Sequence, residues 1–352
     1  MLNHLILYCR PGFEGECAAE IQERAAAMQS HGYAKARPGS GWVLFSPYEP
    51  GRAGELARAL EFRSLIFARQ LLATPGLVAE LPVHDRLSPL LAALDGLAER
   101  YSALWLETAD TNEAKALSVF CRKFAVPARA ALERAGRLAG DAPGLPRLHL
   151  FFLGSAAAYP ALSWPDNASP WPMGIPRLRF PAGAPSRSTL KLEEALLLFL
   201  DPAERAQRLA PGMRAVDLGA APGGWTWQLV RRHLQVSAID NGPLDKALLD
   251  SGLVEHRRED GFRYRPPRPV EWMVCDMVES PSRIARLVAQ WLAEGCCRES
   301  IFNLKLPMKK RYVEVKRCID LIAEALAGIP YRLALKQLYH DREEVTGHLR
   351  RL

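Results

Sequence analysis

The most constraining feature of this sequence is a glycine-rich turn between an apolar strand and a helix, in residues 213–226 (MRAVDLGAAPGGWT). The apolar run ends at Asp217, and a helical pattern begins at Trp225. The turn between them contains Gly219, Gly223 and Gly224. Glycine lets a backbone approach a ligand closely, and the amino end of a helix favours a carboxylate or phosphate. The stretch therefore predicts an α/β domain that binds a ligand at the carboxyl ends of its strands.

The spacing of the glycines decides between classes of ligand. The dinucleotide fingerprint Gly-x-Gly-x-x-Gly is absent, and so is the Gly-Lys-Ser/Thr of a phosphate-binding P-loop. Asp240 closes the strand 236–239, where a carboxylate can bind both hydroxyls of a ribose. Asp260 follows the next short strand, where it can accept a hydrogen bond from an adenine amino group. Each acid alone is more often a surface residue, but their order behind this loop favours an adenosyl cofactor.

An acid at the end of a first strand, followed by Gly-x-x-x-Gly-Gly, resembles motif I of S-adenosylmethionine-dependent methyltransferases. The resemblance implies that S-adenosylmethionine is the cofactor. The residues expected to bind it are Gly219, Ala221, Pro222, Gly223, Gly224, Asp240, Asp260 and Asp276.

The end of the fourth strand supplies the first candidate for chemistry. Asp276 lies there, on the side of the sheet where the cofactor is expected. The Asn/Asp-Pro-Pro-Tyr/Phe sequence that is typical of amino-methyltransferases is absent at this point. Cys275 stands where a covalent carbon-5 pyrimidine methyltransferase needs a nucleophile, but its apolar neighbours favour a buried thiol.

Two lysines and a further acid complete a recognisable set. Lys191, Asp276, Lys305 and Glu344 resemble the K-D-K-E tetrad of the heat-shock ribosomal RNA 2′-O-ribose methyltransferases. By this resemblance Lys305 deprotonates a ribose 2′-hydroxyl, Asp276 and Lys191 position the lysine and the hydroxyl, and Glu344 orients the group. The resemblance also places Ser188 near the cofactor, whereas its position alone fits a helix cap.

Two questions about this tetrad stay open at the level of sequence. Only one of Glu343 and Glu344 can face the site, because successive strand residues point to opposite sides. Glu344 is predicted, since the family's acid directly precedes Val and Tyr, and Val345 follows here, although Thr346 replaces the Tyr. A lysine with an ordinary pKa of about 10.4 is protonated at neutral pH. Burial and a second lysine lower the pKa of Lys305, while carboxylates raise it, and either effect can dominate.

The N-terminal half has a different pattern. Strand-like and helix-like segments alternate as β-α-β-β-α-β over residues 1–80, which predicts a ferredoxin-like domain. A second mixed segment covers 81–163, and six prolines within 164–185 predict a linker before the methyltransferase domain at 186–352. The N-terminal half resembles the ferredoxin-like plus THUMP region of RNA-modifying enzymes. The whole chain, with its phrases LYCRPGFE and YHDREEV, resembles the large-subunit methyltransferase M group. The expected fold class is thus α+β followed by Rossmann-like α/β.

Composition sets limits on these expectations. The chain has 352 residues, 49% of them hydrophobic and 24% charged, which suits two or three folded domains and excludes a mainly disordered or fibrous protein. The net charge of +7 is compatible with an anionic partner. Seven cysteines without paired C-x-x-C motifs indicate reduced thiols in a cytoplasmic protein. We expect no signal peptide, no membrane span, no metal site, and a monomer rather than an obligate oligomer.

These expectations converge on one function and leave two alternatives. The resemblance implies 2′-O-ribose methylation of a cytidine in the peptidyl-transferase region of bacterial 23S ribosomal RNA, with protein-free or early-assembly RNA as the substrate. The first alternative is a THUMP-containing base methyltransferase that acts on tRNA, which a Pro-Pro-Tyr motif would have favoured. The second is an RNA-binding assembly factor without catalysis, which loss of a tetrad residue would have favoured.

Overall fold

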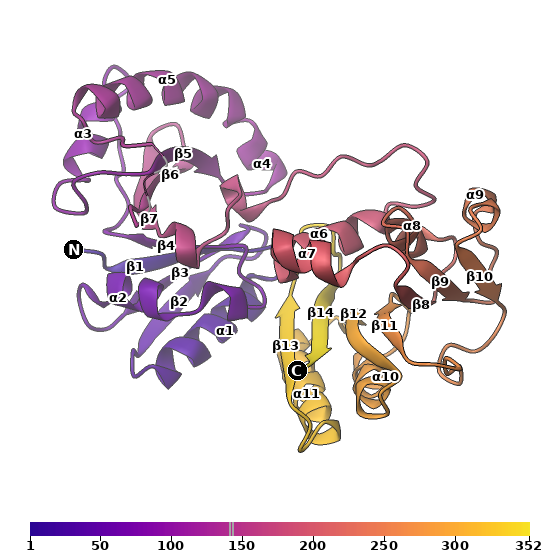
Figure 1. Ribbon diagram of the computed structural model, residues 1–352. Helices are drawn as coiled ribbons and strands as arrows, with labels where there is room; N and C mark the ends of the chain where they lie inside the picture. The colour runs from indigo at the N-terminus through magenta and orange to yellow at the C-terminus, as the bar shows by residue number, and fades with distance from the viewer. Residues whose placement is uncertain (141, 143) are drawn as a thin grey trace. The chain divides into compact units, whose positions relative to one another are not determined.

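The computed structural model describes residues 1–140, 142 and 144–352. The chain divides into two compact units, Met1–Pro176 and Arg177–Leu352. Each unit is built on its own seven-stranded sheet, and each is described here by itself (Figure 1). None of the helices formed by the described residues is both long and apolar enough to cross a bilayer.

The first unit begins with the predicted β-α-β-β-α-β order. Its elements are β1 (His4–Tyr8), α1 (Glu14–Ala27), β2 (Gly32–Ala36), β3 (Trp42–Pro47), α2 (Arg52–Ala59), the short η1 (Phe62–Ser64) and β4 (Gln70–Thr74). The strands pair antiparallel in the order β2-β3-β1-β4. Leu5, Ile6 and Leu7 on the central strand β1 are buried on both of its faces, which explains why this strand is continuously apolar.

The second part of this unit extends the same sheet. It contains α3 (Leu87–Ala92), β5 (Ala103–Thr108), α4 (Asn112–Lys115), α5 (Ser118–Arg134), β6 (Arg147–Gly154) and β7 (Ala157–Ser163). β7 joins β4 where Ala73 pairs with Leu162, so the sheet runs without a break from β2 to β5. Two adjacent predicted domains therefore share one sheet; the domain boundaries themselves stay a prediction.

The proline-rich stretch after β7 starts as part of this unit. It contains two short 3₁₀ turns, η2 (Pro165–Asn167) and η3 (Pro172–Gly174). The Asn167 side chain accepts from the backbone N–H of Phe62 at 2.9 Å and donates to the carbonyl of Leu60 at 2.6 Å. Residues up to Pro176 thus belong to the compact first unit.

The second unit is a Rossmann-like α/β domain. Its elements are α6 (Thr189–Phe199), α7 (Pro202–Arg208), β8 (Arg214–Leu218), α8 (Gly224–Val230), β9 (Gln235–Ile239), α9 (Lys246–Asp250), β10 (Val254–Arg257), β11 (Val270–Cys275), α10 (Pro281–Ala293), β12 (Cys297–Lys305), α11 (Arg311–Ala325), β13 (Tyr331–Lys336) and β14 (Glu344–Arg351). The strand order is β10-β9-β8-β11-β12-β14-β13. β14 runs antiparallel to both its neighbours, β12 and β13, so the other six strands of this sheet share one direction.

This topology brings one set of strand ends together. Five parallel strands, β8 to β12, finish at the same edge, and β14 starts there because it runs the opposite way. Beneath that edge, Ala215, Trp272, Val274 and Ile301 form a buried core with residues of α6 and α8. Ligands of open α/β sheets bind at this edge.

Candidate active site

The four residues predicted as catalytic form one contiguous cluster at this edge. Lys305 Nζ donates hydrogen bonds to Asp276 Oδ1 and to Glu344 Oε2. Lys191 Nζ lies 2.5 Å from Glu344 Oε1 and 3.4 Å from Asp276 Oδ2. Two ammonium groups thus alternate with two carboxylates, and each carboxylate contacts both lysines.

Each member of the cluster is placed by the end of a regular element. Lys191 lies in the first turn of α6, Asp276 directly follows β11, and Lys305 is the last residue of β12. Glu344 is the first residue of β14 and pairs directly with Lys305 in the antiparallel ladder.

The structure distinguishes the two neighbouring glutamates. The Glu344 side chain is 5% exposed and lies in the cluster. The Glu343 side chain is 59% exposed and pairs with Arg311 at the start of α11. The alternation of a strand therefore directs Glu344, as expected, toward the two lysines.

The charges of the cluster set its protonation. Burial by itself lowers the pKa of Lys305, but the carboxylates of Asp276 and Glu344 outweigh it and hold that pKa above its ordinary value. Burial likewise raises the pKa of Glu344, but Lys305 and Lys191 outweigh it and lower that pKa. Lys305 is therefore an ammonium group at neutral pH in this state, which answers the question that the sequence left open.

A buried polar layer behind the cluster was not identified from the sequence. Asn303 Nδ2 donates to Asp276 Oδ1 at 2.8 Å, and Thr346 Oγ1 donates to Asn303 Oδ1 at 2.7 Å. Thr346 also lies 3.0 Å from both carboxyl oxygens of Asp341. The available signal was two-residue spacing, since Asn303 and Thr346 each stand two positions from a tetrad residue on their strands and so share its face.

Glu194 connects the helix of Lys191 to the loop before β14. It is buried one turn after Lys191, and its carboxylate accepts from the backbone N–H groups of Tyr339 and His340 at 2.8 and 2.9 Å. His340 Nδ1 lies 2.6 Å from the same carboxylate. One helix thus supplies a site lysine and also fixes the loop that leads to Glu344.

The glycine-rich loop packs tightly beside the cluster. Gly219 has φ +78°, and a Cβ there would lie 2.7 Å from the Met277 side chain. A Cβ on Gly224 would lie 2.2 Å from Ser188 Oγ, so only glycine allows the start of α8 to approach Ser188. Ser188 Oγ in turn lies 2.6 Å from Ser186 Oγ. The predicted loop residues and Ser188 are therefore neighbours in space.

Asp240 organises the remainder of the loop. Its Oδ2 accepts from the Ala221 N–H at 3.0 Å, and its Oδ1 accepts from the Gly242 N–H at 2.7 Å. The carbonyl of Pro222 accepts from the Asp245 N–H at 3.0 Å. Because a carboxylate oxygen has two lone pairs, both oxygens of Asp240 can still accept from a ribose.

Asp260 and Asp217 have contrasting surroundings. The Asp260 side chain is 53% exposed, and its Oδ1 accepts from the Phe262 N–H at 2.8 Å within its own turn. Asp217 is buried, Thr226 Oγ1 donates to its Oδ2 at 2.6 Å, and its Oδ1 has no hydrogen-bond partner among the described residues. Burial raises the pKa of Asp217 to about 7. An orphaned carboxyl oxygen beside the glycine loop fits a site that binds a polar cofactor.

Two other kinds of chemistry find no support in the described residues. Cys275 is fully buried, and burial raises the pKa of its thiol to about 12, so it is not a thiolate at neutral pH. Within the described part of the chain, no three His, Cys, Asp or Glu side chains are grouped as a metal site.

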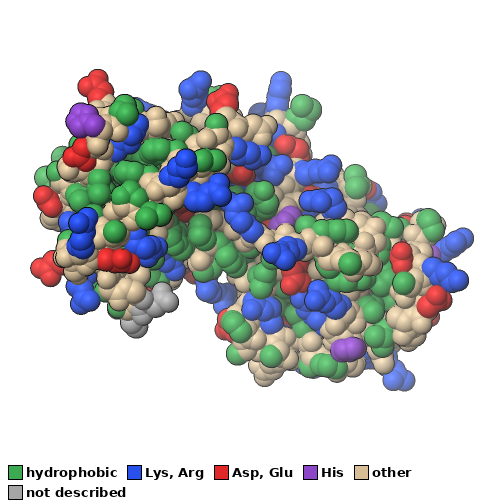
Figure 2. All heavy atoms as spheres, turned by 90° about the horizontal axis from the view of Figure 1, so that it is seen from above, with side chains coloured by type: hydrophobic (Ala, Val, Ile, Leu, Met, Phe, Trp, Pro, Cys, Tyr) green, Lys and Arg blue, Asp and Glu red, His purple; other side chains and the backbone are tan. Residues whose placement is uncertain are grey.

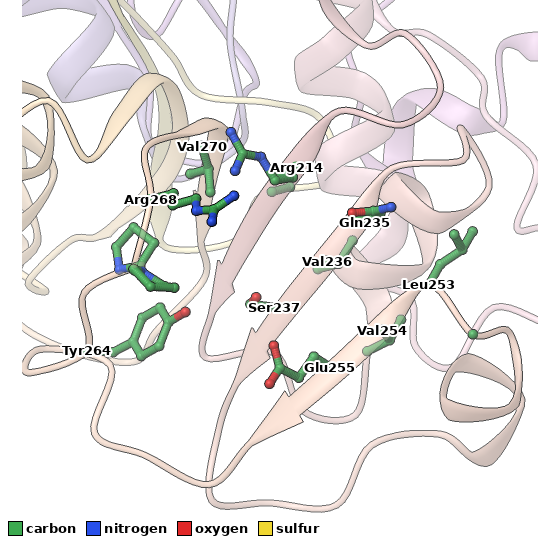
Figure 3. Close-up of a pocket in the computed structure, with 14 residues that line it drawn as sticks. Arg214, Gln235, Val236, Ser237, Leu253, Val254, Glu255, Tyr264, Arg268 and Val270 are labelled. Atoms are coloured by element: carbon green, nitrogen blue, oxygen red, sulfur yellow. The ribbon is translucent and has the colours of Figure 1, made fainter.

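A cavity of about 460 Å³ lies at the opposite end of the sheet (Figure 3). Arg214, Gln235, Val254 and Val270, the first residues of their strands, line it. Arg268 also lines this cavity. The cavity is therefore separate from the cluster at the carboxyl ends of the strands.

Comparison with known proteins places this geometry in a family. Three family models match: the RlmM ferredoxin-like domain over residues 2–72, the N-terminal region of ribosomal RNA large subunit methyltransferase M over 85–164, and the FtsJ-like methyltransferase over 184–323. The ribosomal RNA large subunit methyltransferase M of Methylococcus capsulatus is 60% identical over 349 residues, which cover 99% of this chain and 98% of the relative. The chain belongs to the ribosomal RNA large subunit methyltransferase M family.

Further relatives agree with this membership. The protein of the same name from Stutzerimonas stutzeri is 56% identical and covered at 100% in both chains, and that from Citrobacter koseri is 54% identical, with 100% of this chain and 97% of the relative covered. Membership confirms the predicted methyltransferase, the S-adenosylmethionine cofactor class, and the ferredoxin-like and Rossmann-like folds. The roles of individual site residues and the THUMP-like character of residues 81–163 stay predictions.

Proposed function

We propose that this protein methylates the ribose 2′-hydroxyl of a cytidine in bacterial 23S ribosomal RNA, with S-adenosylmethionine as methyl donor. One observation carries the proposal: Lys191, Asp276, Lys305 and Glu344 converge beside the glycine-rich loop. The names of the relatives support ribosomal RNA of the large subunit as the substrate. Asp240, Ser188 and the loop would hold the cofactor, which supplies an electrophilic methyl group when bound.

The cluster suits a hydroxyl nucleophile. A ribose 2′-hydroxyl is a poor nucleophile at neutral pH, so it needs alignment and help in losing its proton. Lys305 and Lys191 can each donate to the hydroxyl oxygen and stabilise negative charge that develops there. Asp276 and Glu344 hold the two ammonium groups in place.

The charged state of Lys305 sets a condition on its role. We expected Lys305 to deprotonate the hydroxyl, and only its neutral form can do so. Its raised pKa means that this form is scarce at neutral pH. A base role therefore requires Lys305 to lose its proton before the transfer. In a role as a cation that stabilises the alkoxide, Lys305 keeps its proton and the hydroxyl proton passes to water.

The first unit supports recognition of RNA. Lys and Arg side chains are spread over the face of each unit that Figure 2 presents. Such residues neutralise phosphates, and binding that rests on them weakens steeply as salt rises. We propose that the first unit contributes this binding, and that the substrate is protein-free or early-assembly RNA in the cytoplasm, bound by a monomer.

Two measurements test the proposal. Mass mapping of ribosomal RNA from a deletion strain should find one ribose methyl group missing from 23S RNA. Tritiated methyl transfer to protein-free 23S RNA, mature 50S subunits and intact ribosomes should label the protein-free RNA most strongly. A missing methyl on a base, or on tRNA, would favour the base-methyltransferase alternative. A complete methylation pattern in the deletion strain would favour the non-catalytic assembly factor.

A further inference from the structure

A continuous chain of hydrogen bonds runs from the site into the interior of the second unit. Starting at Lys305, it passes through Asp276, Asn303 and Thr346 and ends at Asp341. Asn303 and Thr346 are fully buried, and Asp341 is 1% exposed. Such buried polar groups are costly unless every donor and acceptor is paired, so the direction of each bond is restricted.

The partners at its two ends, Asp276 and Asp341, determine which group donates in each hydrogen bond. Asn303 must present its NH₂ group to the carboxylate of Asp276, so its carbonyl oxygen faces Thr346 and accepts from the hydroxyl. Thr346 has then used its only proton, and its oxygen can only accept from Asp341. Asp341 Oδ2 already accepts from the Leu338 N–H at 2.9 Å. The remaining oxygen, Oδ1, lies 3.0 Å from Thr346 and is the position for a proton.

The charges around Asp341 agree with this direction. Burial raises its pKa well above the ordinary value, and the nearby carboxylates of Glu344 on β14 and Glu194 on α6 raise it further. The ammonium group of Lys191 acts in the opposite sense, and the Leu338 N–H does so as well. Burial and the two carboxylates outweigh these opposing effects, so the Asp341 side chain is a neutral acid that can donate a hydrogen bond.

We propose that Asp341, Thr346 and Asn303 are positioning residues, and that Asp341 acts as a neutral hydrogen-bond donor that fixes the carboxylate of Asp276 against Lys305. The proposal rests on the proposed function, because it assigns these residues to the same methyl transfer. Asn303 holds Asp276 Oδ1 on the side of Lys305 and leaves Oδ2 toward Lys191. The carboxylate therefore keeps one orientation while a substrate hydroxyl enters.

Thr346→Val is the central test, because it keeps the shape of the side chain and removes the hydroxyl. When this series of hydrogen bonds is interrupted, Asp276 is held less firmly and stabilises the Lys305 ammonium group less. We expect single-turnover methylation of 23S RNA to fall about 10-fold, by analogy with the loss of a charged hydrogen bond. We also expect the pH dependence assigned to Lys305 to shift to lower pH, while the KM for S-adenosylmethionine stays unchanged. Thr346→Ser, which restores the hydroxyl, should recover both the rate and the pH profile.

Variants of Asp341 distinguish a neutral carboxylic acid, which donates to Thr346, from a carboxylate, which can only accept. In Asp341→Asn the amide NH₂ can donate to Thr346 while the amide oxygen accepts from Leu338, so this variant should be at least several-fold more active than Asp341→Leu. Equal loss in both variants would overturn the neutral-donor assignment. Ser300→Ala is the matched control, since Ser300 is a fully buried hydroxyl on β12 outside the chain of hydrogen bonds.

Spectroscopy keeps the proposal testable if a variant is unstable. In the wild-type protein, the ¹³C carboxyl resonance of Asp341 should have the shift of a protonated acid at pH 7. An ionised Asp341, or the same Lys305 pH profile in wild type and Thr346→Val, would overturn the proposal. If wild-type protein gave no 2′-O-methylated product, the proposed function would fail, and ¹⁵N titration of the Lys305 amine in the two proteins would still test the positioning role.

Discussion

Lys305 and Glu344 are direct partners in the antiparallel ladder between β12 and β14, and their side chains are hydrogen-bonded. Lys305 is the last residue of one strand and Glu344 is the first residue of the other, although 39 positions separate them in the chain. A shift of one residue in this register would turn Glu344 away from the site. The register of one strand pair therefore completes the cluster.

Removal of the Lys305 amine should abolish methyl transfer without loss of the cofactor. Lys305→Ala should reduce single-turnover methylation to background, while calorimetry shows S-adenosylmethionine affinity near that of wild type. Lys309→Ala is a matched control, because Lys309 is exposed four residues later. Near-normal turnover of Lys305→Ala would contradict the tetrad assignment, and Cys275→Ser would then test covalent catalysis.

The pH dependence of the chemical step distinguishes the two roles of Lys305. Its folded pKa is raised, so the ammonium form persists through neutral pH and the neutral form appears only at alkaline pH. If Lys305 is the base, the single-turnover rate should increase with pH, about tenfold per unit while the neutral fraction is small. If Lys305 acts as a cation, the rate should fall as the amine loses its proton. A rate that stays constant from neutral pH through the titration of the Lys305 amine, with a folded protein throughout, would exclude both roles.

Asp217 should make the stability of the protein depend on pH. Its folded pKa of about 7 exceeds the unfolded value of about 3.9, so the folded state retains a proton that the unfolded state loses. Stability should therefore fall as pH rises from about 4 to about 7 and then level off. Asp217→Asn removes this contribution, so its melting temperature should rise relative to wild type across that window. If the melting temperatures of the two proteins changed with pH in the same way, the pKa of Asp217 would not be raised.

Asp240 should contribute to cofactor affinity both directly and through the loop. Asp240→Ala removes the acceptor for the Ala221 and Gly242 N–H groups and for the cofactor ribose. We expect S-adenosylmethionine binding to weaken by about 1.5–3 kcal/mol, the range for hydrogen bonds to charged groups. Asp260→Ala, at an exposed position, should cost less. Unchanged affinity of Asp240→Ala by calorimetry would remove Asp240 from the site.

The second unit alone should bind the cofactor but select RNA poorly. The fragment Ser186–Leu352 contains the whole cluster and nearly all of the second compact unit. It should bind S-adenosylmethionine like the full chain, yet lose most methylation of 23S RNA, while full-length binding to RNA falls steeply with salt. Equal labelling of protein-free RNA, 50S subunits and ribosomes by the fragment would show that the first unit does not select the substrate.

Regular patterns in the sequence predicted most elements, and the differences have local physical causes. The sequence pattern predicts a strand around residues 65–73, but β4 begins only at Gln70. The N–H groups of Ile66 and Phe67 donate instead to the buried carboxylate of Glu20, at 2.5 and 2.9 Å. Local periodicity contains no information about this distant acceptor.

The secondary structure around two prolines, Pro127 and Pro160, differs from the prediction. The sequence predicts two helical stretches, near 112–124 and 127–139, but residues on both sides of Pro127 form one helix, α5. Cys121, Ala128 and Leu132 of this helix bury against the same core. The uncharged run 148–165 predicts a strand followed by turns, but its second part, which contains Pro160, forms the strand β7. It is stabilised by pairing with β6 over most of its length. Packing thus outweighed the loss of single backbone hydrogen bonds.

By itself, the sequence determined the type of fold and the glycine-rich loop, because strand periodicity and short motifs depend on neighbours along the chain. Its resemblance to a known family predicted the four tetrad residues. The tertiary structure decided which glutamate faces the lysines, that carboxylates keep Lys305 charged, and that Asp341 lies behind Asp276. These properties depend on strand register and on distances between residues far apart in sequence. Charge interactions and burial act through space, so only the folded chain could determine them.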